Sequence, residues 1–181
     1  MKFKVKNSEL AGKLSLVARA LATSGVNPTL GGILVEAESG RLAFSSTDSN
    51  LGLRVPVHVE GTVESDGKVL LPGRLFADIS RSLGGGEAEI EYQSSERTVS
   101  VRSGTSRFNL RTLNDQDFPP MPDAAGETVS LGRESLLETI ELVARAASRD
   151  DMRPVLTSVQ VLASGSELTM VATDSYRLAV K

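Results

Sequence analysis

The feature that most constrains the fold of this chain is an internal repeat with a fixed period. The segment LVARA occurs at 16–20 and 142–146, and TDS occurs at 47–49 and 173–175, both at an offset of 126 residues. Over 10–49 the same offset gives 14 identities in 40 positions without a gap. So dense a match at one offset indicates two copies of one structural unit.

The period also predicts the domain organisation. The first copy ends near Gly126, so we expect a first domain over 1–124 and a second over 125–181. Lys181 is the counterpart of Val55, and nothing in the second copy corresponds to 56–126. We therefore expect a complete first domain and only the N-terminal part of a second. The alternative is a single domain with an appendage.

Composition narrows the class of protein. The chain is 40% hydrophobic and 24% charged, as is usual for a globular protein, and its lack of cysteine excludes disulfides and thiolate chemistry. No apolar run approaches the length of a membrane span, and the N-terminus MKFKVKNSEL lacks a signal region. We expect a cytoplasmic protein without membrane contact. Because the net charge is −3, any DNA-binding surface must come from segregated charge.

The hydrophobic pattern of the first copy predicts an α+β domain. A strand over KFKVK precedes a helix that Asn7 or Ser8 can cap, with one apolar face. That face holds Leu10, Leu14, Val17 and Leu21. Strands are expected at 32–37, 41–46, 51–59, 87–92, 97–102 and 105–111. A second helix at about 73–82 should bury Leu75, Phe76 and Ile79 and expose Arg74, Asp78 and Arg81.

The second copy is expected to begin in the same order. A strand at 127–131 should precede a helix at about 133–147, followed by strands at about 155–163 and 167–173. Leu136, Ile140 and Val143 form the apolar face of that helix. Each helix thus has an apolar stripe and a polar face that carries arginine. This layout places the helices on one side of the sheets, with the arginines towards solvent or a ligand.

Enzymatic sites find little support in the residues. The only histidine, His58, lies in a strand-like segment, and 84–86 is a glycine turn that lacks the lysine and the helix of a phosphate loop. Asp150 and Asp151 are adjacent, so their side chains point apart, and no third metal ligand lies nearby. We expect no catalytic residues, no metal and no cofactor. A small hydrolase remains a weak alternative.

Four motifs resemble one known family. They are MKFKV at the start, LLPGRLFADISRSL at 70–83, VRSGTSRFNLRTL at 101–113 with DFPPMP after it, and ATDSYRLAV at 172–180. In this order they are similar to the bacterial DNA polymerase III beta subunit, the sliding clamp. The resemblance implies a DNA clamp fold with the second repeat truncated, and a non-catalytic processivity factor that encircles duplex DNA. The family's clamp has three repeats per chain and closes as a head-to-tail homodimer.

The resemblance also implies three surfaces. A sliding ring should touch phosphates loosely, and the candidate DNA-binding residues are Arg74, Arg81, Arg19, Arg145 and Arg149. A pocket for short peptide motifs would use Leu156, Thr173, Ser175, Tyr176, Arg177 and Leu178. The subunit contact would use Ile79, Arg107, Phe108 and Leu110. The Thr-Asp-Ser turn occurs in both copies, so we interpret it as structural and assign peptide binding to the three residues that follow it.

The implied partners are double-stranded DNA, the DNA polymerase III alpha subunit, the clamp loader and other proteins with clamp-binding motifs. The alternative is a two-repeat binding module that grips a protein partner without encircling DNA.

Overall fold

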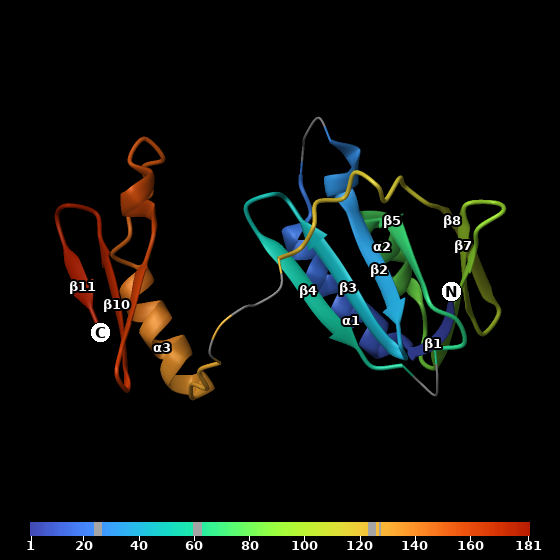
Figure 1. Cartoon of the computed structure of the whole chain (residues 1–181), viewed down its shortest axis with the longest axis horizontal. Helices are drawn as coiled ribbons and strands as arrows, with labels where there is room; N and C mark the ends of the chain where they lie inside the picture. The colour runs from blue at the N-terminus through green and yellow to red at the C-terminus, as the bar shows by residue number, and fades with distance from the viewer. Residues whose placement is uncertain (24–26, 60–62, 123–125, 127) are drawn as a thin grey trace. The chain divides into compact units, whose positions relative to one another are not determined.

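The computed structural model describes residues 1–23, 27–59, 63–122, 126 and 128–181. It divides into unit 1, Met1–Asp123, and unit 2, Ala124–Lys181, which are described separately (Figure 1). The elements of unit 1 are β1 (Lys2–Lys6), α1 (Asn7–Val17), η1 (Ala18–Ala20), η2 (Pro28–Gly31), β2 (Gly32–Glu38), β3 (Arg41–Thr47), β4 (Gly52–Val57), β5 (Gly67–Pro72), α2 (Gly73–Ser82), β6 (Glu87–Gln93), β7 (Thr98–Ser103) and β8 (Ser106–Arg111). Those of unit 2 are α3 (Arg133–Ala144), η3 (Pro154–Thr157), β9 (Gln160–Ser164), β10 (Glu167–Thr173) and β11 (Leu178–Val180).

Unit 1 is built from two antiparallel sheets with the strand orders β1-β6-β7-β8 and β4-β3-β2-β5. Alternate side chains on the strands, among them Phe3, Ile33 and Val101, are fully buried in one core with the apolar faces of α1 and α2. The rings of Phe44 on β3 and Phe76 on α2 meet edge to face, with centroids 6.1 Å apart. Apart from β5, for which no range was predicted, each strand of unit 1 ends within one or two residues of its predicted bounds.

The start of α1 differs from the expectation. The helix begins at Asn7 itself, and no side chain caps it. The Asn7 side-chain amide instead donates to the carbonyl of Gly84 at 2.6 Å and to the hydroxyl of Ser103 at 2.8 Å. The capping prediction is wrong because tertiary contacts use this buried side chain to join the helix to the glycine turn. Leu21 is buried as predicted, but it lies beyond the end of the helix.

The α2 helix has the predicted bounds but a different buried face. Phe76 and Ile79 are buried, whereas Leu75 is 51% exposed. The buried face also includes Ala77 and Ser80, and at about 100° per residue Leu75 lies nearly opposite Ala77. The prediction that Leu75 is buried is therefore wrong.

Unit 2 repeats the strand register of unit 1. Its sheet has the order β11-β10-β9, and Glu167 pairs with Ser164 as Arg41 pairs with Glu38, while Thr173 pairs with Leu178 as Thr47 pairs with Gly52. Every pair is displaced by the same 126 residues that separate the sequence motifs. The two copies therefore share one fold at the level of individual backbone pairs.

Three boundaries in unit 2 correct the predictions. Residues 128–132 form no strand, and residue 127 lies outside the described residues. In unit 1 the equivalent β1 pairs with β6, and the described part of unit 2 contains no strand equivalent to β6 that could supply hydrogen bonds. The α3 helix ends at Ala144, three residues before the predicted end. Strand β9 begins at Gln160, later than predicted, because Pro154 starts the 3-10 turn η3, as Pro28 starts η2.

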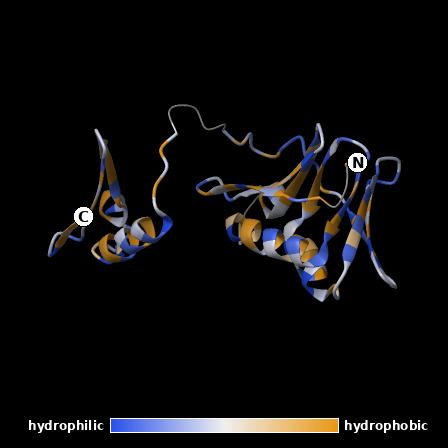
Figure 2. Cartoon of the chain, turned by 90° about the horizontal axis from the view of Figure 1, so that it is seen from below, coloured by the Kyte–Doolittle hydropathy of each residue, from blue (hydrophilic) through white to orange (hydrophobic). Residues whose placement is uncertain are grey.

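The apolar face of α3 is only partly covered. Val143 is buried, but Ile140 is 40% exposed, although its counterpart Leu14 in unit 1 is fully buried. In unit 1, α1 packs against α2 and β4, and no helix equivalent to α2 occurs in the described part of unit 2. Ile140 therefore lies on the predicted apolar face of α3 but is not covered. Apolar residues recur along α3 (Figure 2), and Leu137, Ile140 and Leu142 remain exposed.

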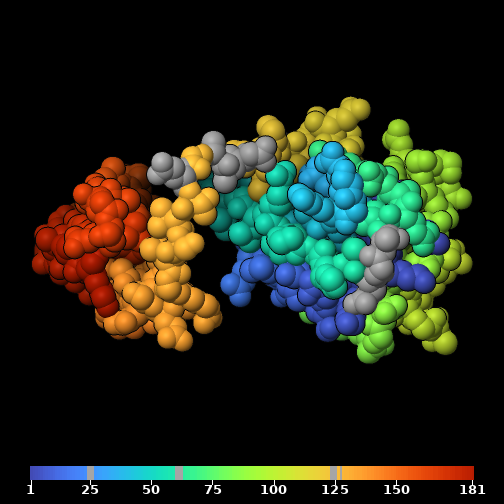
Figure 3. All heavy atoms as spheres, turned by 60° about the horizontal axis from the view of Figure 1, so that its bottom comes forward, coloured from blue at the N-terminus to red at the C-terminus, as the bar shows by residue number. Residues whose placement is uncertain are grey.

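The segment after β8 runs along the surface of unit 1 (Figures 1 and 3). Phe118 packs against Leu34 and Leu70 on the face of the β4-β3-β2-β5 sheet that points away from the main core, and Met121 packs beside them. The hydroxyl of Thr29 donates to the carbonyl of Asp117 at 3.3 Å. This proline-containing segment is therefore fastened to unit 1.

No helix among the described residues is long and apolar enough to cross a membrane.

Candidate functional site

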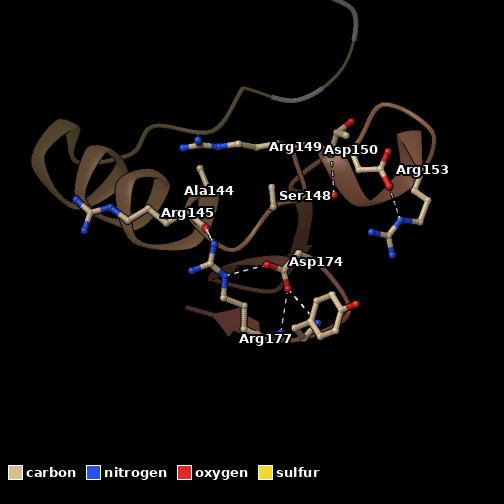
Figure 4. A pocket seen from close by; sticks show the side chains of 11 residues that line it. Ala144, Arg145, Ser148, Arg149, Asp150, Arg153, Asp174 and Arg177 are labelled. Atoms are coloured by element: carbon tan, nitrogen blue, oxygen red, sulfur yellow. Dashed lines mark hydrogen bonds and ion pairs between the residues drawn. The ribbon is translucent and has the colours of Figure 1, made fainter.

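A pocket of about 800 Å³ lies in unit 2 between the end of α3 and the turn that joins β10 to β11 (Figure 4). Two residues predicted for peptide binding, Tyr176 and Arg177, line it together with two predicted for DNA binding, Arg145 and Arg149. The other lining residues are Ala144, Ala147, Ser148, Asp150, Arg153, Thr157 and Asp174. Four predicted peptide-binding residues lie outside this lining, namely Leu156, Thr173, Ser175 and Leu178.

Backbone hydrogen bonds build the turn beside the pocket. The Thr173 hydroxyl accepts from the amide of Ser175 at 3.1 Å and donates to the carbonyl of Arg177 at 2.7 Å. The Asp174 carboxylate accepts from the amides of Tyr176 and Arg177, each at 3.0 Å. Thr173 and Ser175 therefore shape the turn. The hydrogen bond from the Tyr176 amide is the main cause that holds the pKa of Asp174 below its ordinary value.

The equivalent turn in unit 1 has the same construction. The Asp48 carboxylate accepts from the amides of Asn50 at 2.9 Å and Leu51 at 2.7 Å, and these bonds lower its pKa. Ser49 and Ser175 both have a φ of 79°. The prediction that the Thr-Asp-Ser turn is structural agrees with this geometry.

The residues after the turn distinguish the two copies. In unit 2, Tyr176 is 92% exposed and Leu178 is 66% exposed. In unit 1, Gly52 takes the place of Leu178, and an ideal Cβ on Gly52 would lie 2.9 Å from the Cε of Met121. The fastened segment of unit 1 therefore covers the position that is equivalent to the exposed Leu178 of unit 2.

The adjacent aspartates do not form a paired site. The Asp150 carboxylate accepts from the amide of Met152 at 3.0 Å and from the Nε of Arg153 at 3.0 Å. The hydrogen bond from the Met152 amide contributes most to lowering the pKa of Asp150, and the bond from Arg153 adds to it. Asp150 thus shapes the loop after α3, as the loop interpretation of the sequence requires.

The five candidate DNA-binding arginines are all exposed. Arg74 and Arg81 lie on α2, where Arg81 forms an ion pair with Asp78. Arg19 in η1 and Arg145 directly after α3 occupy equivalent positions just past a helix, rather than on the helical faces that the sequence predicted. Arg149 lies in the following loop.

The candidate subunit contact lies around β8, an edge strand of its sheet. Arg107 is exposed and Phe108 is partly exposed. Ile79 and Leu110 are 8% and 2% exposed and belong to the core of unit 1. Their side chains therefore present little surface for contact with a partner.

Sequence reasoning missed Asp174 and Arg153 as residues that line the pocket. Asp174 repeats Asp48, and this repetition indicated only a turn. The sequence did contain a signal for them. Asp150 and Asp174 each stand three residues before an arginine, and each forms an ion pair with that arginine.

Two α+β units with one strand register, displaced by a constant period, define a protein built from repeated domains. Residues 1–122 match the N-terminal domain of the DNA polymerase III beta subunit, and residues 130–181 match its central domain. The chain belongs to the DNA polymerase III beta subunit family.

Individual relatives agree with this assignment. The chain is 39% identical to the beta sliding clamp of Streptomyces coelicolor over 100% of this chain and 47% of that protein, and 36% identical to that of Micrococcus luteus over 100% and 57%. It thus spans about half the length of the curated relatives it matches. The crystal structure of the DNA polymerase III subunit beta from Pseudomonas aeruginosa matches with a TM-score of 0.90 and 29% identity, over 99% of this chain and 49% of that chain. A second structure, a sliding clamp from that organism bound to griselimycin, matches with a TM-score of 0.90 and 30% identity, over 99% and 48%.

Proposed function

We propose that this chain contributes repeats to a DNA sliding clamp, an accessory subunit without catalytic residues that encircles duplex DNA and tethers replication proteins to it. The observation that carries the proposal is the repeated fold, in which each copy matches its own domain of the same family. We place the first domain at 1–124 and the second from 125 onwards. The separation into compact units between Asp123 and Ala124 supports this division, although residues 123–125 lie outside those described.

The proposed partners follow from this role. They are duplex DNA, the DNA polymerase III alpha subunit, the clamp loader and other proteins with clamp-binding motifs, all met in the cytoplasm. A second subunit would pair with the β8 edge, where Arg107 and Phe108 offer side chains and Ile79 and Leu110 support the strand from the core.

We assign peptide binding to the surface formed by the pocket and the 176–178 segment. Tyr176 and Leu178 supply exposed apolar area, Leu156 lies nearby in η3, and Thr173, Ser175 and Arg177 maintain the turn. A short linear motif needs such apolar anchor positions together with a few fixed polar groups. We further propose that griselimycin, the ligand of one structural neighbour, uses this surface.

A titration of griselimycin into the chain tests this surface. We expect Leu178→Asp to weaken binding by about tenfold or more, because a charge would replace an apolar anchor. Leu137→Asp on α3 is the matched control, since Leu137 is also exposed but lies outside both the pocket lining and the 176–178 segment. Absence of binding to the native chain, or equal affinity for both variants, would refute the assignment.

We assign DNA contact to Arg74 first, and to Arg81, Arg19, Arg145 and Arg149 with it. Arg74 is exposed and has no ion-pair partner among the described residues, whereas Asp78 already neutralises Arg81. Arg74→Ala should therefore weaken duplex binding more than Arg81→Ala does. Removal of one arginine–phosphate interaction should reduce the salt slope of the binding constant by about 0.9.

Fluorescence anisotropy with a labelled duplex at several salt concentrations measures this difference. Arg41→Ala on β3 is the control, because Arg41 is exposed but lies on neither helix. A larger effect of Arg41→Ala than of Arg74→Ala would contradict the assignment.

Retention of the complete gene product on closed circular DNA, and its loss after linearisation, tests the encirclement itself.

A further inference from the structure

We propose that Asp174 is a positioning residue for partner binding. It holds the Arg177 guanidinium against the end of α3, and thereby fixes the exposed 176–178 segment in its binding conformation. The inference rests on the proposed peptide surface and extends it, because it gives Arg177 a role inside the protein instead of a direct contact with the partner.

The Arg177 side chain joins two parts of unit 2, the turn before β11 and the end of α3 (Figure 4). The Nε of Arg177 donates to the Asp174 carboxylate at 3.0 Å, and its Nη2 donates to the carbonyl of Arg145 at 2.5 Å. That carbonyl belongs to Arg145, the capping residue directly after α3, where helix carbonyls lack partners within the helix. Arg177 therefore links the turn to the helix end across 32 residues of sequence.

The carboxylate of Asp174 serves both halves of this arrangement. One oxygen accepts the two backbone amides of the turn, and the other accepts the Arg177 guanidinium. A planar guanidinium presents donors on separate nitrogen atoms in fixed directions, whereas an ammonium group has one nitrogen whose donors rotate. Because Asp150 is already bound to Arg153, the described residues that line the pocket offer Arg177 no second free carboxylate.

Unit 1 provides an internal comparison. Asp48 makes the same two backbone contacts, but Leu51 stands at the position of Arg177, so this turn has no link through residue 51 to the end of α1. The backbone turn therefore forms without the link. The added arginine occurs in the copy whose following residues are open to a partner, which points to a role in binding and not in forming the turn.

Loss of the link between Asp174 and Arg177 should lower the affinity for a partner more than it lowers the stability of the fold. The Arg177 side chain is 63% exposed, and ion pairs at such positions contribute little to folding. Without the link, the 176–178 segment would sample other conformations, and the observed affinity would fall in proportion to the fraction that remains competent.

The test compares Asp174→Asn with Asp48→Asn in the whole chain. Asparagine keeps an oxygen for the backbone amides but places an NH₂ group opposite the Arg177 Nε. We expect Asp174→Asn to weaken griselimycin binding about fivefold, in line with an exposed ion pair. Its Arg177 Nε–H resonance should shift, with faster exchange in the free protein. Asp48→Asn should leave both readouts unchanged.

Arg177→Lys provides a second variant that keeps the charge but not the two-acceptor geometry. It should bind griselimycin as weakly as Asp174→Asn does. If the native chain binds griselimycin and Asp174→Asn binds it equally well, the positioning role is overturned while the peptide surface stands. If the native chain does not bind, the proposed surface fails, and the positioning role fails with it. A native Arg177 Nε–H resonance that Asp174→Asn does not move would overturn the link itself.

Discussion

Two equivalent positions in the repeat should respond very differently to the same truncation. Leu14 on α1 is fully buried, whereas Ile140, its counterpart on α3, is 40% exposed. Both residues lie on the apolar face of the first helix in their unit. We predict that Leu14→Ala strongly destabilises unit 1 and that Ile140→Ala affects unit 2 only slightly.

The magnitude follows from burial and from the cavity that each change leaves. Truncation of a fully buried leucine costs about 3 kcal/mol, because the lost transfer free energy adds to that of an unfilled cavity. Ile140 leaves no closed cavity and is already partly hydrated, so about 1 kcal/mol is expected. With a urea dependence of about 1.5 kcal/mol per molar, the midpoint for unit 1 should fall by about 2 M in Leu14→Ala.

Urea denaturation followed by circular dichroism at 222 nm measures the midpoint. Hydrogen exchange with mass spectrometry separates peptides of α1 from those of α3, so that each unit reports its own stability. Equal losses of stability in the two variants would refute the reasoning, since they would show that the α3 face is as well covered as the α1 face.

Two further predictions concern close packing and acid. Gly73→Ala should destabilise unit 1 by about 1–3 kcal/mol in the same urea assay, because its Cβ would lie 2.7 Å from side-chain carbons of Leu21. Gly52→Ala should cost less than about 1 kcal/mol, since the close contacts of its Cβ would be with the flexible end of Met121. A larger loss than that of Gly73→Ala would contradict this ranking. The pKa of Asp48 is lowered in the folded protein by backbone hydrogen bonds, so its contribution is present above the ordinary aspartate pKa and is lost as pH falls through the lower folded value. Asp48→Asn should therefore flatten the acid side of a plot of melting temperature against pH, and an unchanged slope would show that these bonds do not stabilise the fold.

The amino-acid sequence by itself determined the features that depend on neighbours a few residues apart. The bounds of α2, most strands of unit 1 and the Thr-Asp-Ser turn follow from local periodicity and turn chemistry. The repeat itself is also a property of the sequence. It predicted that both copies share one fold, and the equal strand registers agree with it.

Only the tertiary structure decided which predicted strands find a pairing partner and which apolar positions become buried. Residues 128–132 have a strand-like pattern, but the described part of unit 2 offers them no strand for pairing. Ile140 has a helical apolar position, but no second helix among those described residues covers it. Asn7 likewise contacts Gly84 in place of its own helix end.

The candidate site divides in the same way. The family resemblance supplied Tyr176 and Leu178, and the repetition of the turn in both copies assigned peptide binding to the residues that follow it. Sequence reasoning could not find the contact between Arg177 and the carbonyl of Arg145, since a side chain's partner 32 residues away depends on how the helix packs on the sheet. Local patterns specify backbone conformation, whereas burial and side-chain partners depend on segments that meet only after folding.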